Sequence, residues 1–406
     1  MKPTIVNILL QAMTILSKAL LLFTMSYYLS VRELGIFGLM LVAMNMLMYL
    51  LGMEFYTFSR RAILHHHEND VPRLFRDQLV FHGIIYLLIL PISLLLFVSE
   101  ILPSYLIAWF YLVLVLDHIA QELQRFLITL SKPIQAAFMT FIRAGAWVYV
   151  MTILMIFNIS TRNLNIVFAS WFGGISFSIL IAVYWLRNYE WKKTLKVPVN
   201  WPWINKGWRI SLPFMGATFS IIAVTMVSKL TIKYFWGIEY VGIYTFYLTA
   251  RNSIQSIIDA GITFILQPKI ITAYQSGRLR EYSLLMRQLT WEILILSIAL
   301  FLFAGIAIKP IISLLDKPIF ATNLDAYWIV ISTVIITAID SIFHSALYVR
   351  HHDRSIMASS ILGMIFAVIF NLLIVPEHGL MGAAISTGLA GIIVNVSKMI
   401  LLCRNR

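Results

Sequence analysis

The sequence is poor in charged residues and has a single cysteine, and both shortages exclude classes of protein. Only 12% of the 406 residues are charged, roughly half of what a soluble domain carries. Cys403 has no second cysteine with which to form an intrachain disulfide or a multi-cysteine metal site. Phosphate-binding loops, dinucleotide-binding fingerprints and zinc-ligand spacings are also missing. No nucleophile and base form a catalytic constellation, so we expect neither an enzyme nor a resident cofactor or metal.

The longest run of histidines, His65 to His67, stands beside Glu68 and Asp70. Three consecutive side chains on a helix point in different directions, so they do not converge on one ion. We therefore expect this run to be a solvated loop and not a metal site.

Long apolar runs are what the sequence has in abundance. Hydrophobic residues make up 60% of the chain, and the mean hydropathy is +0.85. The runs reach about twenty residues, the length that a helix needs to cross a bilayer. The first run extends to about residue 30 and contains Lys18, and no small-residue cleavage site follows it. It is expected to be a retained transmembrane helix and not a signal peptide.

Hydropathy predicts an all-α polytopic membrane protein with about twelve spans in two six-helix lobes. The predicted spans are residues 4–30, 35–58, 78–98, 102–130, 134–157, 164–186, 210–234, 240–267, 288–308, 325–349, 355–375 and 379–402. A basic, tryptophan-rich segment separates an N-terminal lobe (1–186) from a C-terminal lobe (210–406). This segment, 187–209, is expected to be a linker at the cytoplasmic membrane surface.

The net charge of +13 is distributed along the chain in a way that predicts membrane orientation. Lysine and arginine concentrate in alternate loops, and such loops face the cytoplasm. Both termini are therefore expected to be cytoplasmic. The excess positive charge then reflects topology and contact with anionic lipid, and no nucleic-acid partner is expected.

The two halves of the sequence resemble each other. Leu34-Gly35-Ile36-Phe37 opens the second span, and Val241-Gly242-Ile243-Tyr244 opens the eighth. The same alignment pairs Asn45 with Asn252. Six spans per half would give both copies the same orientation, related by a pseudo-twofold axis along the membrane normal. The two glycines are expected to permit tight turns at helix entries, and a substrate site is expected between the lobes.

Four basic residues lie within predicted spans, where an uncompensated charge is costly. They are Lys18, Arg143, Lys229 and Arg251. Lys18 is too deep to reach the membrane surface, so it should face a lumen or an acidic partner. Lys229 is near a span end, where reaching the surface is an equal alternative. Arg143 and Arg251 face a similar choice between a lumen and a buried carboxylate.

Further polar groups accompany these cations. Arg251, Gln255 and Asp259 are spaced i, i+4, i+8 and so share one helix face. Glu54, Asp117, Asp340 and His344 add protonatable groups, which ion coupling requires. Ordinary hydrogen bonding between helices is the competing interpretation of each.

Three stretches carry a resemblance to a known family. YYLSVRELGIFGLMLVAMNMLMYLLGMEFYTFSRR, FWGIEYVGIYTFYLTARNSIQSI and HGLMGAAIST resemble the second, eighth and last helices of polysaccharide and O-antigen flippases. These proteins belong to the multidrug/oligosaccharidyl-lipid/polysaccharide exporter superfamily. The resemblance implies a cationic cavity that moves undecaprenyl-pyrophosphate-linked sugar units between leaflets. Lys18 and Arg251 match cations of the family's first and eighth helices, whereas its second-helix cation has no counterpart, since Glu54 is the only ionisable residue within that span.

The expected function is therefore a flippase that works by alternating access in the bacterial cytoplasmic membrane. A proton or sodium gradient, or the membrane potential, would drive it, and a polysaccharide polymerase would be a partner. Pyrophosphate contacts are assigned to Lys18, Arg251, Arg143 and Lys229. Lumen and coupling roles are assigned to Glu54, Asp117, Asp259, Asp340, His344, Gln255, Asn45 and Asn252. The alternatives are a cation exporter of the multidrug and toxin extrusion type, whose cavity should be acidic, and a non-transporting scaffold of a glycan assembly complex.

Overall fold

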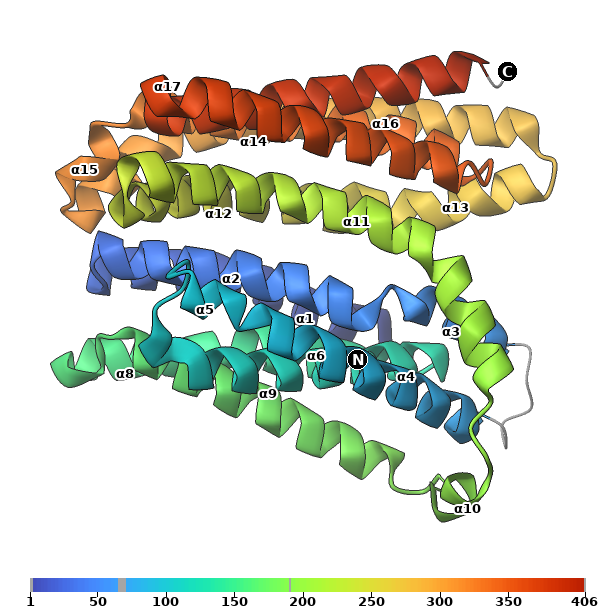
Figure 1. Ribbon diagram of the computed structural model, residues 1–406. Coiled ribbons are helices and arrows are strands. Elements are labelled where there is room, and N and C mark those ends of the chain that lie inside the picture. The colour runs from blue at the N-terminus through green and yellow to red at the C-terminus, as the bar shows by residue number, and fades with distance from the viewer. Residues whose placement is uncertain (1–2, 65–70, 190, 405–406) are drawn as a thin grey trace. The chain divides into compact units, whose positions relative to one another are not determined.

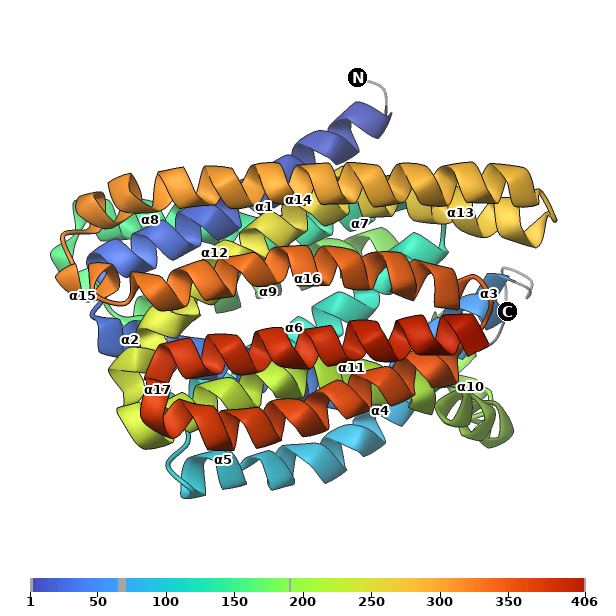
Figure 2. The ribbon, with the colours of Figure 1, turned by 90° about the horizontal axis from the view of Figure 1, so that it is seen from above.

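The computed structural model describes residues 3–64, 71–189 and 191–404, and they are almost entirely helical (Figure 1). Eleven helices in these ranges are long and apolar enough to cross a membrane. The last, α17 (Asp353–Arg404), contains two predicted spans, because Gly379 interrupts its helical backbone with φ 53° and ψ −126°. Figure 2 shows its two arms running side by side. The prediction of an all-α membrane protein is confirmed. The expectation for His65 to His67 lies outside the described residues.

The residues group into two compact units, each of which is described by itself. Unit 1 comprises Met1–Leu21 and Met40–Met215, and unit 2 comprises Leu22–Leu39 and Gly216–Arg406. The corner between α1 (Pro3–Tyr28) and α2 (Val31–Gly52) therefore packs with the C-terminal half of the chain. The predicted lobe boundaries, at 186 and 210, place this corner in the N-terminal lobe, whereas its residues Leu22–Leu39 group with unit 2.

Unit 1 is built from short and medium helices. After its part of α2 come α3 (Phe55–Leu64), α4 (Val71–Ser93), α5 (Leu95–Val98), η2 (Ser104–Leu106), α6 (Ile107–Thr129), α7 (Pro133–Phe141), η3 (Ile142–Ala146), α8 (Trp147–Phe157), η4 (Ile159–Thr161), α9 (Leu164–Leu186), α10 (Trp191–Lys196) and the first turns of α11 (Trp201–Trp236). Local residues set several starts. Pro133 occupies the first turn of α7, and the Asn163 side chain accepts a hydrogen bond from the Ile166 N–H at the start of α9.

The second predicted span, 35–58, is not one continuous helix. Helix α2 ends at Gly52, and Met53 and Glu54 then adopt left-handed backbone angles, with φ 48° and 53°. Left-handed residues stop a right-handed helix, so the chain turns before α3 begins. Glu54 consequently lies at the break between two helices and not inside a span.

Unit 2 holds the longer helices. They are the rest of α11, α12 (Ile238–Ile258), η5 (Asp259–Thr263), α13 (Phe264–Gln275), α14 (Leu279–Leu315), α15 (Pro318–Ala321), α16 (Leu324–Tyr348) and α17. Helix α16 packs against α12, α14 and α17. Both α11 and α14 extend beyond the predicted spans 210–234 and 288–308, because hydropathy detects only the apolar part of a helix. The first turns of α11 also occupy part of the segment expected to be a linker.

Buried aromatic side chains hold unit 2 together through their polar ends. Tyr247 donates to the Phe320 carbonyl at 2.6 Å, and Tyr327 donates to the Ala304 carbonyl at 2.9 Å. Both rings are almost fully buried. A buried tyrosine contributes a large apolar area, but its hydroxyl must find a partner. Backbone oxygens supply that partner here and fix α12 to α15 and α16 to α14.

Two glycines let α2 and α12 approach each other within unit 2. A Cβ on Gly35 would lie 2.1 Å from the Ile238 carbonyl oxygen, and a Cβ on Gly242 would lie 2.1 Å from that of Val31. The neighbouring atoms are backbone, which a rotamer change cannot move. The glycines are thus explained by a close helix crossing, and not by the tight turns that the sequence suggested.

Candidate functional site

The polar stripe of Arg251, Gln255 and Asp259 exists in unit 2 as the sequence spacing predicts. Helix α12 carries the first two residues, and the π-helix η5 begins at the third. The Gln255 amide donates to Asp259 Oδ1 at 3.0 Å, which confirms that the i and i+4 positions share a face. A π-helix adds a residue to a turn and commonly marks a functional position.

Arg251 is held by neutral groups. Its guanidinium donates from Nε to Thr333 Oγ1 at 3.2 Å and from Nη2 to Thr337 Oγ1. Its Nη1 donates to Asn252 Oδ1 at 3.0 Å. The two threonines are one turn apart on α16, so the fork of the guanidinium spans one turn of the neighbouring helix. This arrangement orients the arginine, which also interacts electrostatically with Asp259.

A second charged group lies further along α16. Lys398 of α17 is 1% exposed and contacts Asp340 Oδ1 at 2.6 Å. The Asp340 side chain remains 29% exposed. His344 lies one turn beyond Asp340, and its ring stacks on Tyr348. The distribution of basic residues counted Lys398 with the cytoplasmic charges, whereas the structure buries it as the counter-charge of Asp340.

Lys229 is also buried in unit 2. Its ammonium donates to the Gly38 carbonyl of α2 at 2.8 Å. The contact is next to the Gly35–Gly242 crossing and ties α11 to the α1–α2 corner. Lys317, which follows the C-terminal end of α14, also contacts the α1–α2 corner: its ammonium donates to the Ser26 and Leu29 carbonyls. Burial lowers the pKa of the Lys317 ammonium, against the opposing effect of the Glu33 carboxylate.

Two predicted residues of unit 1, Glu54 and Arg143, lie close enough to Tyr49 of α2 to interact with it electrostatically. Arg143, in η3, pairs with Asp117 of α6 at 2.8 Å, so two of the predicted site residues neutralise each other. Lys18 of α1 and Asn45 of α2 have exposed side chains. Glu54 lies at the α2–α3 break described above.

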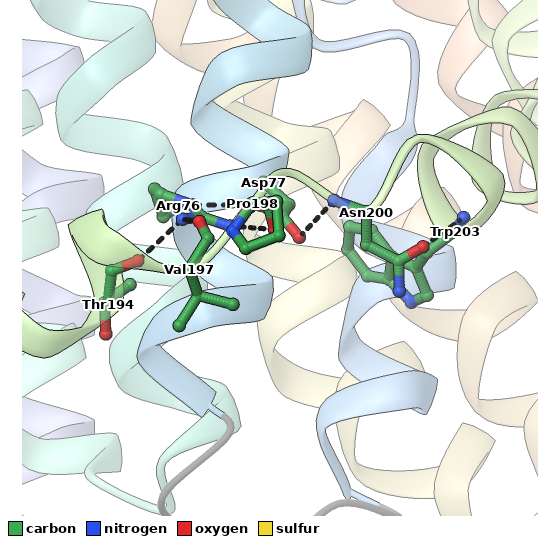
Figure 3. Close-up of polar contacts among 7 residues, drawn as sticks. All are labelled: Arg76, Asp77, Thr194, Val197, Pro198, Asn200 and Trp203. Atoms are coloured by element: carbon green, nitrogen blue, oxygen red, sulfur yellow. Dashed lines mark hydrogen bonds and ion pairs between the residues drawn. The ribbon is translucent and has the colours of Figure 1, made fainter.

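The central linker is anchored to unit 1 by two adjacent residues of α4 (Figure 3). Arg76 and Asp77 form an ion pair, and the Asp77 side chain is fully buried. Arg76 also donates to three linker carbonyls. They belong to Thr194, at 2.6 Å, Val197 and Pro198, at 3.3 Å.

The same clamp sets the start of α11. The second oxygen of Asp77 accepts from the Asn200 N–H at 3.3 Å, and the Asn200 side chain accepts from the Trp203 N–H at 3.1 Å. A side-chain acceptor three residues before a helical N–H is an N-cap. The clamp therefore joins α4, the linker and the first turn of α11 into one structure.

A further polar group of unit 1 escaped the sequence analysis. His82 of α4 and His118 of α6 are buried beside Glu122, with ring centroids 5.0 Å apart. The spacing Gln78, His82, Tyr86 on one helix, and His118, Glu122 on the next, was the available signal. Within residues 3–64, 71–189 and 191–404, no group of three or more histidine, cysteine or acidic side chains is arranged to hold a metal ion.

No family model and no curated protein sequence matches the chain. Solved structures do resemble it over its full length. A multidrug resistance MATE family transporter of the MOP superfamily, in an inward-facing conformation, has a TM-score of 0.76 at 14% identity over 99% of this chain and 97% of its own. The outward-facing conformation of a MATE family transporter gives 0.64 at 14% identity, over 100% and 96%.

Another similar structure is a MOP superfamily transporter from Pyrococcus furiosus Vc1 (DSM3638), described as having a binding pocket of reverse polarity that suggests a different function. It gives a TM-score of 0.62 at 13% identity, covering 99% of this chain and 93% of that one. The chain therefore has the fold of MATE transporters of the MOP superfamily, a fold of two six-helix lobes. Identities this low establish the fold alone, and the flippase family stays a prediction.

Proposed function

We propose that this chain is a membrane exporter of amphipathic organic cations that works by alternating access, as a multidrug MATE transporter. The observation that carries the proposal is the full-length likeness to a multidrug resistance transporter. It supports this function better than the flippase function that the sequence favoured.

The charges inside the spans agree with a cavity that is not purely cationic. Arg143 is paired with Asp117, and Lys398 is paired with Asp340. Asp259, which accepts a hydrogen bond from Gln255, provides a carboxylate in unit 2 for a cationic substrate. A cation bound by a carboxylate in a low-dielectric site gains much more than in water.

A flippase for lipid-linked oligosaccharides is the second candidate, and Arg251 favours it. Its hydrogen bonds to Thr333, Thr337 and Asn252 orient a guanidinium, a group that binds phosphate through charge-assisted hydrogen bonds. The reverse polarity described for the Pyrococcus furiosus transporter also supports the idea that this fold serves substrates of more than one charge.

Two substitutions in unit 2 distinguish the candidates. Purified protein in liposomes would be assayed for efflux of a fluorescent organic cation and for flipping of a fluorescent polyprenyl-pyrophosphate sugar. An exporter should lose cation efflux at least about tenfold in Asp259→Asn, because removing one buried charge contact costs at least about 2 kcal/mol. Arg251→Ala should retain it.

The flippase candidate requires the reverse pattern, with sugar flipping lost in Arg251→Ala and retained in Asp259→Asn. Glu281→Gln, which changes an exposed carboxylate of unit 2, is the matched control. Wild-type protein that moves neither substrate would refute both candidates.

A further inference from the structure

Unit 1 contains a buried polar cluster that the proposed substrate site does not use. Two stripes face each other across α4 and α6, and we name them together the α4–α6 cluster. Its members are Gln78, His82 and Tyr86 on α4, and His118 and Glu122 on α6. The residues of each stripe are four apart, so they lie on one helix face. His82, His118 and Glu122 are at most 2% exposed.

The cluster forms a chain of short contacts. Gln78 donates to Glu122 Oε2 at 2.5 Å. His118 Nε2 lies 4.0 Å from Glu122 Oε1, and His118 Nδ1 shares a hydrogen bond of 2.6 Å with the Tyr86 hydroxyl. Glu122 is thus linked to His118, and His118 to Tyr86.

The His118 imidazole has unused hydrogen-bonding capacity. Within the part of the chain that the structure describes, His118 Nε2 makes no hydrogen bond, and the His82 ring interacts with the Gly52 backbone. Buried polar atoms without partners destabilise a fold, and apolar side chains would pack here without that cost. A site that binds protons needs such nitrogens, because imidazole gains a charge and a donor when it is protonated.

A small pocket reaches the cluster at Glu122. Its volume is about 10 Å³, room for roughly one water molecule, and its polar lining includes Gln78, Glu122, Arg125 and Tyr56, but neither histidine. Glu122 therefore separates the pocket from the two imidazoles. A proton that enters the pocket meets the carboxylate first.

Other charged groups near the cluster come from several directions. Arg125 of α6 donates to Glu122 Oε1 at 2.6 Å and stacks over the Tyr56 ring of α3 at 3.8 Å. Glu54 interacts electrostatically with both Arg125 and Tyr56. Tyr49 of α2 interacts electrostatically with Glu54 and Arg125, and Arg143 of η3 pairs with Asp117, the residue before His118. Helices α5 and α7 contain no titratable residue, and α9 contains only Tyr184. Where α10 meets α4, Arg76 and Asp77 pair with each other.

We propose that the α4–α6 cluster is the binding site for the proton that drives transport, an inference that rests on the proposed exporter function. Glu122 accepts a proton from water in the pocket and becomes a neutral acid. The His118 ring, whose Nε2 lies 4.0 Å from Glu122 Oε1, then moves within hydrogen-bond distance, takes the proton at Nε2 and becomes an imidazolium beside the restored carboxylate. Release reverses these steps. Sodium is disfavoured, because two imidazoles and a carboxylate already bound to a guanidinium do not supply the oxygen ligands of a hard cation.

The first test measures cation accumulation in proteoliposomes under an imposed pH gradient or an imposed sodium gradient. Wild type should respond to the pH gradient, and Glu122→Gln and His118→Asn should lose that response while still exchanging substrate at equal concentrations. Glu281→Gln, at an exposed carboxylate of unit 2, should behave as wild type. Accumulation driven by sodium alone, or an undiminished pH response in Glu122→Gln, would overturn the proposal and leave the exporter function standing.

The second test needs no substrate. Infrared difference spectra of the reconstituted protein between acidic and neutral pH should contain a buried carboxylic acid band that Glu122→Gln removes and Glu281→Gln retains. If this band titrates while wild type moves neither substrate, the proton site stands and the exporter function fails. If Glu122→Gln leaves the spectrum unchanged although its melting temperature is native, the site is wrong.

Discussion

The crossing of α2 and α12 predicts that Gly242→Ala destabilises the protein. The added Cβ would lie 2.1 Å from the Val31 carbonyl oxygen, whereas real Cβ atoms essentially never approach within 3.0 Å. The two helices must therefore separate by about 1 Å, and overpacking of this kind costs about 1–3 kcal/mol. The higher helix propensity of alanine returns about 1 kcal/mol. We expect a net loss of up to about 2 kcal/mol.

The measurement is thermal unfolding of the purified protein in detergent, followed by tryptophan fluorescence. Gly35→Ala should act like Gly242→Ala, because its Cβ meets the Ile238 carbonyl at the same distance. The double variant should lose less than the sum, since one separation of the helices relieves both contacts.

Gly83→Ala and Gly173→Ala are matched controls, because an added Cβ at either helical position meets no atom within 4 Å. Both should melt at or above the wild-type temperature. If Gly242→Ala melts with these controls, the close crossing is not present in the protein and the reasoning is wrong.

Three further predictions concern charged groups. Asp77→Asn should lower the melting temperature far more than Glu281→Gln, because leaving Arg76 buried without its partner costs about 3–5 kcal/mol, whereas an exposed pair such as Arg278–Glu281 contributes about 0–1 kcal/mol. Asp117→Asn should lower the stability of unit 1 more in the wild-type background than in an Arg143→Met background, where its partner is already missing. Equal losses of stability in the two backgrounds of this double-mutant cycle would refute the pairing. Burial lowers the pKa of Lys317, so between that lowered pKa and about 10.5 the unfolded chain binds more protons than the folded one. Stability then increases as the pH rises through this window. The melting temperature should therefore rise more steeply with pH in wild type than in Lys317→Met.

Hydropathy was sufficient to predict most of the fold, because a helix in lipid must be apolar over its whole bilayer-crossing length. It failed where the helix continued outside that length, as in α11 and α14. It also failed at Met53 and Glu54, where two left-handed residues stop a helix without a glycine or proline in either position.

The site residues were partly predictable for a similar reason. Helical spacing placed Arg251, Gln255 and Asp259 on one face, but it contained no information that Thr333 and Thr337 would receive the arginine. Pairings such as Arg143 with Asp117 and Lys398 with Asp340 depend on which helices become neighbours. Periodicity within one helix does not determine that choice.

The clamp on the central linker has a consequence for how this segment tolerates change. All three linker atoms that Arg76 binds are main-chain oxygens, of Thr194, Val197 and Pro198. Main-chain oxygens are present whatever the side chain, so these positions should accept many amino acids. The number of residues between them, however, sets where each oxygen lies. The linker is therefore free to vary in sequence while its length is constrained, and a one-residue deletion should do more harm than several substitutions.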